Sequence, residues 1–150
     1  MVTGKPIATK ASLPQGTVTF LFTDIEGSTK LLQRLGPDYA GVLGGHRDLL
    51  RAAFTRHNGC EVDTQGDAFF VAFARASEAL AAAVASQLAL FAHPWPHGEP
   101  VLVRMGIHTG QPVLVDNHYV GIDVHRAARI CSAAHGGQIV TSAATHTLVQ

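Results

Sequence analysis

Apolar residues recur along the chain with two different periods, and together these periods predict a domain that mixes strands with helices. Short runs rich in β-branched and aromatic residues indicate strands, whereas longer segments with apolar residues three and four positions apart indicate helices. The expected strands cover residues 17–24, 60–64, 68–73, 101–108, 113–115 and 138–141. The expected helices cover residues 29–35, 39–57, 76–92, 121–134 and 143–150.

The order of these elements predicts an α+β fold. Its central series of strand, helix, hairpin, helix and strand matches the ferredoxin-like βαββαβ arrangement, with an antiparallel-rich sheet and flanking helices. Ser28 or Thr29 is expected to cap the helix after the first strand, and Ser142 is expected to cap the last helix. Residues 1–16 lack periodicity and are expected to form a flexible N-terminal tail, which leaves one domain over residues 17–150.

Composition and charge restrict the function classes. Lys+Arg and Asp+Glu number 11 each, so the formal charge is zero, which argues against a general surface for nucleic acid or anionic membrane. No apolar run reaches the roughly 18 residues that a membrane span requires. The two cysteines, Cys60 and Cys131, form no disulfide or metal pattern. We therefore expect a cytoplasmic domain that binds neither nucleic acid nor membrane.

Two acidic residues stand at the ends of expected strands. Asp24 ends the first strand, and Asp67 lies at the tip of the hairpin formed around Gly66. If these strands are neighbours in one sheet, the two carboxylates form a hard oxygen site for Mg²⁺ or Mn²⁺. Two such ions can hold the oxygens of a transferring phosphoryl group.

A turn and a later helix supply groups that suit phosphate. The chain turns through Gly27 into a helix N-terminus at Ser28 and Thr29, where free backbone N–H groups attract anions, although a plain capped turn has the same sequence. His125 and Arg129 are four residues apart on an expected helix and share a face. An arginine in that position can stabilise the charge that develops at a reacting phosphorus.

Four segments, taken in order, resemble the class III nucleotidyl cyclases. Residues 20–29 (FLFTDIEGST) are similar to the first metal-binding segment of that family, and residues 64–73 (TQGDAFFVAF) to its second metal-binding hairpin. Residues 104–110 (RMGIHTG) are similar to its central strand, and residues 119–130 (YVGIDVHRAARI) to its dimer-interface helix. Each motif is weak alone, but the set covers most of residues 17–141 in the order of the family.

The resemblance implies a signalling enzyme that converts a purine nucleoside triphosphate to a 3′,5′-cyclic nucleotide and pyrophosphate at a homodimer interface, with two Mg²⁺ or Mn²⁺ ions. The implied metal ligands are Asp24, Asp67 and the backbone carbonyl of Ile25. The implied triphosphate ligands are Arg104 and the amides of Gly27, Ser28 and Thr29. Arg129 is implied to act on the transition state from the partner subunit.

Three positions depart from the adenylyl cyclases. Asp63 stands where they carry Lys, His118 where they carry Asp, and His125 where they carry the Asn that orients the ribose. A carboxylate at position 63 can only accept hydrogen bonds from a purine. His125 can still donate one. Asp63 and His118 therefore leave the purine open, with ATP slightly favoured over GTP.

The same departures support an alternative function, a degenerate cyclase domain that binds nucleotide or only dimerises as a regulatory module. The resemblance also implies that the chain stops before the final strand pair of the family. The chain is therefore expected to be C-terminally short, and further regulatory domains in a longer protein are compatible with it.

Overall fold

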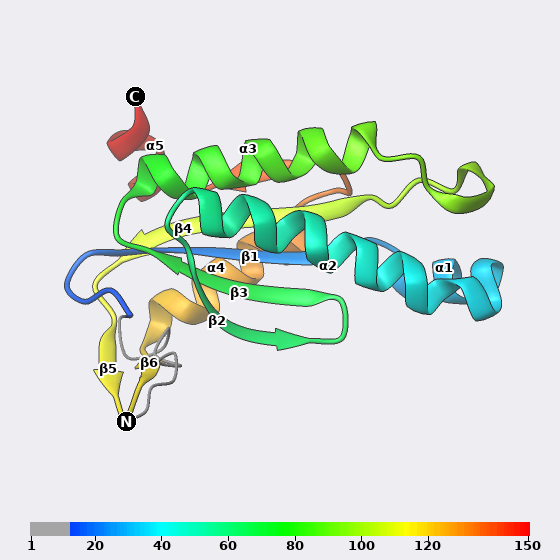
Figure 1. Ribbon diagram of the computed structural model, residues 1–150. Helices are drawn as coiled ribbons and strands as arrows, with labels where there is room; N and C mark the ends of the chain where they lie inside the picture. Colours follow the sequence, from blue (N-terminus) through cyan, green and yellow to red (C-terminus); the bar gives the residue numbers. More distant parts are fainter. Residues whose placement is uncertain (1–12) are drawn as a thin grey trace, which may run out of the picture.

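A five-stranded sheet organises residues 13–150, the part of the chain that this computed structural model describes (Figure 1). Its strands follow the order β2-β3-β1-β4-β7, and every pair is antiparallel except β4 with β7. The first four have the order of a ferredoxin-like sheet, so the expected fold class is confirmed. The strands are β1 (Val18–Ile25), β2 (Cys60–Gln65), β3 (Ala68–Phe73), β4 (Val103–Gly110) and β7 (Ile139–Thr141).

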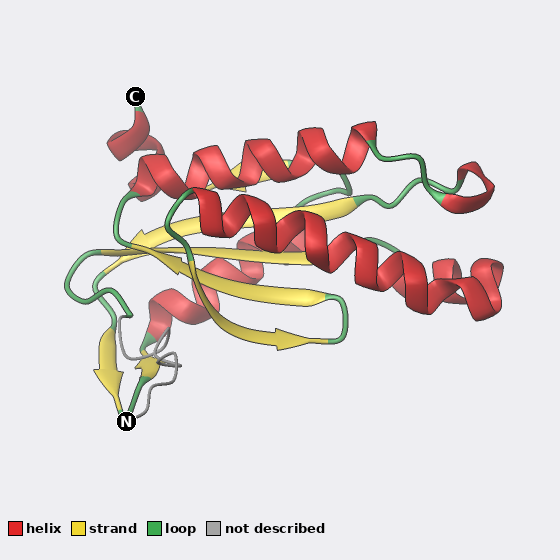
Figure 2. Ribbon diagram, viewed as in Figure 1, coloured by secondary structure: helices red, strands yellow, loops and turns green. Residues whose placement is uncertain are grey.

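Helices cover the two faces of this sheet unequally (Figure 2). Two long helices, α2 (Tyr39–Arg56) and α3 (Ala76–Ala92), lie along one face, which we call the α2/α3 face. A single helix, α4 (Ile122–Ala133), lies on the opposite face, which we call the α4 face, beside the hairpin of β5 (Val113–Val115) and β6 (His118–Val120). The short helices are α1 (Ser28–Leu35), η2 (Gly36–Asp38), η3 (Pro96–Gly98) and α5 (Ala143–Val149).

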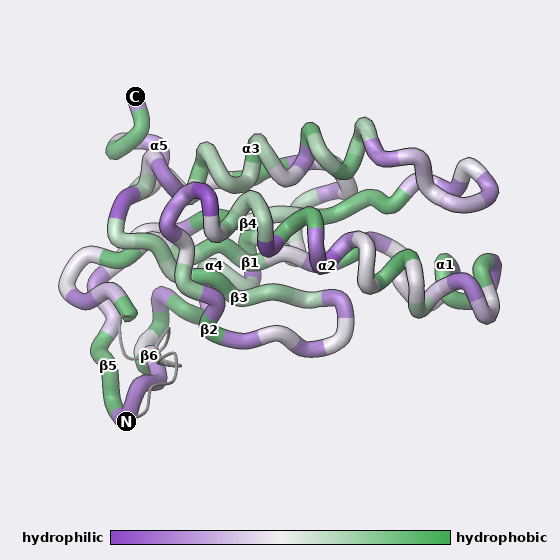
Figure 3. The backbone as a smooth tube through the Cα atoms, viewed as in Figure 1, coloured by the Kyte–Doolittle hydropathy of each residue, from purple (hydrophilic) through white to green (hydrophobic). Residues whose placement is uncertain are grey.

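Alternation along the strands divides the core between these faces. In β1, Leu21 and Ile25 are buried with residues of α2 and α3, whereas Phe20 is buried with Ala127 of α4. Figure 3 shows apolar residues along the central strands and α3, while polar residues gather at the turn between β2 and β3. The polar turn thus lies at one end of an apolar sheet.

Two local expectations had opposite outcomes. Ser142 caps α5 as expected, because its hydroxyl accepts a hydrogen bond from the Thr145 amide at 3.3 Å. The expected cap of α1 by Ser28 or Thr29 is wrong. Gly27 is the capping residue, with a left-handed φ of 66° and no side-chain hydrogen bond, and Ser28 is already helical. The turn out of β1 needs this left-handed conformation, which glycine adopts at little cost.

Most of the expected N-terminal tail, residues 1–12, lies outside the described residues. The part that is described packs against the domain. Leu13 is buried, and the Tyr119 hydroxyl donates a hydrogen bond to the Pro14 carbonyl at 2.6 Å. Within residues 13–150, no helix combines the length and the apolar character needed to cross a membrane.

His46 of α2 is a polar group inside the core. The side chain is 0% exposed and its ring centroid lies 6.0 Å from that of Phe69. Neither ring nitrogen has a hydrogen-bond partner among the described residues. Burial disfavours the charged imidazolium and lowers the pKa of His46 to about 4.

We expect this histidine to make the fold acid-sensitive. The pKa of His46 in the folded protein lies below its unfolded value, so its contribution is complete above ~6.5 and is lost as the pH falls toward about 4. Between pH 7 and pH 4.5, the free energy of unfolding should therefore fall about 2 kcal/mol more in the wild type than in His46→Leu. Urea unfolding at both pH values measures the difference, and an equal loss in the two proteins would contradict this assignment.

Candidate active site

The two acidic residues singled out from the sequence lie at the same end of the sheet. Asp24 is near the end of β1, and β3 pairs with β1 so that Thr23 lies opposite Phe69. The turn before β3 therefore brings Asp67 beside Ile25, whose amide donates a hydrogen bond to the Asp67 carboxylate at 2.6 Å. In an extended strand the N–H and C=O of one residue point to the same side. The Ile25 carbonyl therefore also points toward the turn that carries Asp67.

Asp24 makes a paired contact with Arg104 of β4, which lies opposite it in the strand register. The Arg104 Nε donates to one carboxylate oxygen at 2.7 Å and a terminal nitrogen donates to the other at 2.8 Å. Both side chains are about a quarter exposed, at 28% and 27%. These hydrogen bonds raise the pKa of Arg104, so the guanidinium stays charged in this two-point ion pair.

The turn that carries Asp67 is also held from α2. A terminal nitrogen of Arg47 donates a hydrogen bond to the carbonyl of Gly66, the residue before Asp67. Tyr39 of the same helix lies close enough that Asp67 adds to the effect of burial in raising the pKa of Tyr39. Sequence reasoning missed both residues, because helical periodicity gives no sign of which residues of α2 reach the turn between β2 and β3.

The start of α1 offers backbone donors beside Asp24. Ser28 is the first residue of the helix, so the amides of Ser28 and Thr29 belong to a first turn whose N–H groups have no partner within the helix. Glu26, two residues before Ser28, accepts a hydrogen bond from the Gly136 amide at 3.1 Å. This contact fixes the segment between β1 and α1 to the loop that precedes β7.

An aromatic surface lies on the α4 face next to these groups. Phe22 and Phe70 lie opposite each other on β1 and β3, and their rings stack with centroids 4.4 Å apart. Asp63 of β2 lies opposite Phe70 and accepts hydrogen bonds from the Thr64 amide at 2.9 Å and the Gln65 side chain at 3.0 Å. Phe22, Phe70, Asp63 and Gln65 border an open pocket of about 240 Å³. The stacked pair was not identified from the sequence, although strand alternation places Phe22 on the face of Asp24.

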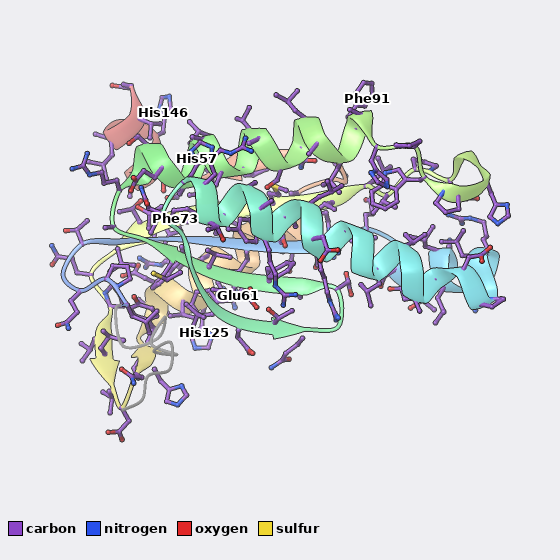
Figure 4. The ribbon with its side chains drawn as sticks, viewed as in Figure 1. His57, Glu61, Phe73, Phe91, His125 and His146 are labelled. Carbon is purple, nitrogen blue, oxygen red and sulfur yellow. The ribbon has the colours of Figure 1, made fainter. Side chains whose placement is uncertain are left out.

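His125 and Arg129 share the exposed side of α4. Ala127 and Cys131 of this helix are buried against the sheet. Because residues two positions apart lie about 200° apart around a helix, His125 and Arg129 point away from the sheet of their own chain. Figure 4 shows His125 below the sheet, on the side opposite α2 and α3. Arg129 therefore does not face Asp24 and Asp67 of the same subunit.

Position 118 is also separate from the carboxylates. His118 is exposed and begins β6, in the two-stranded sheet that it forms with β5. Of the residues singled out from the sequence, the structure thus brings together Asp24, Asp67, Ile25, Arg104 and the start of α1. It leaves His118, His125 and Arg129 on other surfaces.

The position of α4 is set by contacts with β4. A Cβ atom at Gly106 would lie 2.3 Å from the amide nitrogen of Cys131, so only glycine permits this approach. Nearer the start of α4, the Nε2–H of His108 donates to the Asp123 carboxylate at 2.7 Å. The other ring nitrogen forms a hydrogen bond with the Ser142 hydroxyl at 2.8 Å. These contacts join α4 to β4 and α5.

The donor set fits a hard divalent cation. Asp24, Asp67 and the Ile25 carbonyl offer only oxygen, which Mg²⁺ and Mn²⁺ prefer over nitrogen or sulfur. Within residues 13–150 no cluster of three or more His, Cys, Asp or Glu side chains could hold a metal ion. A cation at this end of the sheet would therefore need the backbone carbonyl, water or a ligand's own oxygens to complete its coordination.

Known proteins match the chain over nearly its whole length. A family model described as the adenylate and guanylate cyclase catalytic domain matches residues 11–150. An uncharacterised protein of Mycobacterium tuberculosis is 41% identical over 138 residues, which cover 91% of this chain and 46% of that protein. The adenylate cyclase of Lachancea kluyveri is 36% identical over 154 residues, which cover 86% of this chain and 8% of that protein.

A solved structure has the same fold. An adenylate cyclase of Trypanosoma brucei in its monomeric state superposes with a TM-score of 0.83 at 28% identity, covering 93% of this chain and 78% of that one. The chain spans less than half the length of the curated relatives named above. These matches confirm the resemblance carried by the four sequence segments.

Proposed function

This chain belongs to the adenylate and guanylate cyclase catalytic domain family, and from that membership we propose that it cyclises a purine nucleoside triphosphate. The ribose 3′-oxygen would lose its proton and attack the α-phosphorus, while the bond from that phosphorus to the pyrophosphate oxygen breaks. The products would be a 3′,5′-cyclic nucleotide and pyrophosphate. The observation that carries this proposal is the hydrogen bond from Ile25 to Asp67, because it sets a second carboxylate beside the end of the strand that contains Asp24.

Divalent cations would be held at this end of the sheet by Asp24, Asp67 and the Ile25 carbonyl. When bound, such ions lower the pKa of the ribose hydroxyl and stabilise the charge on the phosphate oxygens. The amides of Ser28 and Thr29 would bind the triphosphate, at the helix end where the dipole favours anions, and Arg104 would bind its terminal phosphates. The left-handed conformation of Gly27 lets the chain turn directly from β1 into this helix.

Arg129 would act across a homodimer interface. On its own subunit it points away from the sheet, so a site that combines Arg129 with Asp24 and Asp67 needs a second copy of the chain. Related by twofold symmetry, each subunit would give its carboxylates to one site and its Arg129 to the other. There the guanidinium would stabilise the charge that develops around the α-phosphorus, and His125 would orient the ribose.

The purine would lie on the α4 face of the sheet. The stacked Phe22 and Phe70 offer an aromatic surface for a base, and Asp63 lies beside them on β2. A carboxylate there accepts from the amino group of adenine, or from N1–H and the amino group of guanine. His118 would reach the base only if the β5–β6 hairpin of one subunit packs near the site.

A nucleotide-binding regulatory module is the second candidate. It is favoured by His118, His125 and Asp63, since all three differ from the residues that adenylyl cyclases carry, and by the location of His118 outside the five-stranded sheet. Binding of a metal–nucleotide complex without turnover would identify this function.

Turnover by the purified protein tests the proposal. With Mn²⁺ and either ATP or GTP, we expect release of the cyclic nucleotide and pyrophosphate, and we expect Asp24→Asn to abolish it. Asp116→Asn is the matched control, because it removes the same charge from the exposed turn between β5 and β6. Absence of product with both nucleotides, or equal product from Asp24→Asn and the wild type, would exclude a cyclase.

A further inference from the structure

The Asp24–Arg104 ion pair joins two groups to which the proposed function assigns different ligands. Asp24 would bind a divalent cation and Arg104 would bind the triphosphate, yet the two side chains bind each other through two hydrogen bonds of 2.7 and 2.8 Å. The pairing is built into the sheet, since the two residues lie opposite each other on β1 and β4. Each side chain therefore already has a partner of opposite charge before its proposed ligand arrives.

The contact weakens Asp24 as a cation ligand. Both of its carboxylate oxygens accept hydrogen bonds from one guanidinium, which neutralises its charge and keeps a positive group within 3 Å of the oxygens. A divalent cation arriving at the same carboxylate would be repelled by that guanidinium. Of the two carboxylates proposed to hold the cations, Asp67 is then the one without an arginine bound to it in the free protein.

A polyphosphate is the ligand that can separate the pair. The paired N–H groups of a guanidinium can donate two parallel hydrogen bonds to phosphate oxygens as well as to a carboxylate. A triphosphate also carries more negative charge than the Asp24 carboxylate. The amides of Ser28 and Thr29 would bring that charge close to Arg104. Arg104 is 28% exposed, so its side chain has solvent-facing space in which to turn.

We propose that the Asp24–Arg104 ion pair is a latch, which keeps the affinity of the free protein for divalent cations low until a polyphosphate takes the guanidinium. The latch rests on the proposed function, since it assigns Arg104 to the triphosphate. Its consequence is coupling: polyphosphate raises the affinity for the cation and, by linkage, the cation raises the affinity for polyphosphate by the same factor. Arg104 is thus both a ligand of the triphosphate and a positioning residue for the metal site.

The test measures binding without turnover. Mn²⁺ affinity of the nucleotide-free protein is measured by electron paramagnetic resonance, and affinity for preformed manganese tripolyphosphate is measured by calorimetry. We expect Arg104→Met to bind free Mn²⁺ about tenfold more tightly than the wild type and the tripolyphosphate complex about tenfold more weakly. Adding Asp24→Asn to Arg104→Met should remove the gain in Mn²⁺ affinity.

Two controls separate the latch from simpler effects. Arg75→Met removes the same charge at the start of α3 and should change neither affinity. Arg104→Lys keeps the positive charge but lacks the paired N–H donors of a guanidinium, so it should bind tripolyphosphate better than Arg104→Met does. A purely structural role for Arg104 would lower both affinities, and a role in phosphate binding alone would leave the Mn²⁺ affinity unchanged. Either result overturns the latch.

Failure of the latch can be distinguished from failure of the proposed cyclase activity. If Arg104→Met gains Mn²⁺ affinity but the wild type makes no cyclic nucleotide, the latch stands and the cyclase proposal fails. If the wild type is active and Arg104→Met gains no Mn²⁺ affinity, the cyclase proposal stands and the latch fails.

Discussion

Asp67→Asn should lower cyclase activity by about 100-fold or more while leaving the thermal unfolding temperature nearly unchanged. The amide oxygen of asparagine can still accept the hydrogen bond from the Ile25 amide, so the turn keeps its place. What the variant loses is one of the two carboxylate charges that are proposed to hold the divalent cations. Initial rates at saturating Mn²⁺ and nucleotide measure the first effect, and calorimetric melting measures the second.

Mixing variants tests the proposed homodimer. Arg129→Ala should be inactive for a different reason, since it removes the group that we propose the partner subunit supplies. In an equal mixture of Asp67→Asn and Arg129→Ala, half of the dimers are mixed and each mixed dimer has one intact site. Activity should then recover to about a quarter of the wild-type value. No recovery after subunit exchange would contradict a shared site, and a large drop in unfolding temperature in Asp67→Asn would make its loss of activity structural.

Gly106→Ala should destabilise the protein by about 3 kcal/mol or more. The new methyl group would lie 2.3 Å from the Cys131 amide nitrogen and 2.6 Å from its Cα, and both are backbone atoms that cannot rotate away. The helix α4 must therefore shift from β4, along with the His125 and Arg129 side chains that it carries. For a domain of this length we expect the unfolding temperature to fall by roughly 10 °C.

Gly44→Ala is the matched control for this substitution. Gly44 lies inside α2, and a Cβ atom there would meet no other atom within 4 Å. Because alanine favours the helix by up to ~1 kcal/mol over glycine, this variant should be as stable as the wild type or more so. Equal unfolding temperatures for Gly106→Ala and the wild type would show that α4 is not held by close contact.

The sequence predicts the secondary structure well where patterns are long. The runs at β1 and β3, and the segments of α2 and α3, extend over enough residues for a period to be recognised. β6 was not expected, because it has three residues, of which only Tyr119 is buried. The cap of α1 was assigned to Ser28 or Thr29 by residue type, but the left-handed turn at Gly27 places both inside the helix.

The candidate site was predictable as a list of residues but not as a set of contacts. That Asp24 and Asp67 lie at the same end of the sheet follows from two strand ends in a ferredoxin-like arrangement. That Arg104 faces Asp24 depends on the register between β1 and β4, which are about eighty residues apart in the chain. Local patterns carry no information about that register, nor about how α2 crosses the sheet to bring Arg47 to Gly66.

The hydrogen bond between Ile25 and Asp67 also gives the protein a built-in spectroscopic probe. The proton of one backbone amide lies against the carboxylate that would receive a cation, at a donor–acceptor distance of 2.6 Å. Its nuclear resonance therefore depends on the charge next to it. The chain has six isoleucines, so labelling them alone with nitrogen-15 yields a spectrum simple enough to assign the Ile25 signal. A diamagnetic cation such as Mg²⁺ could then be titrated while that signal moves, in an intact protein and with no nucleotide present.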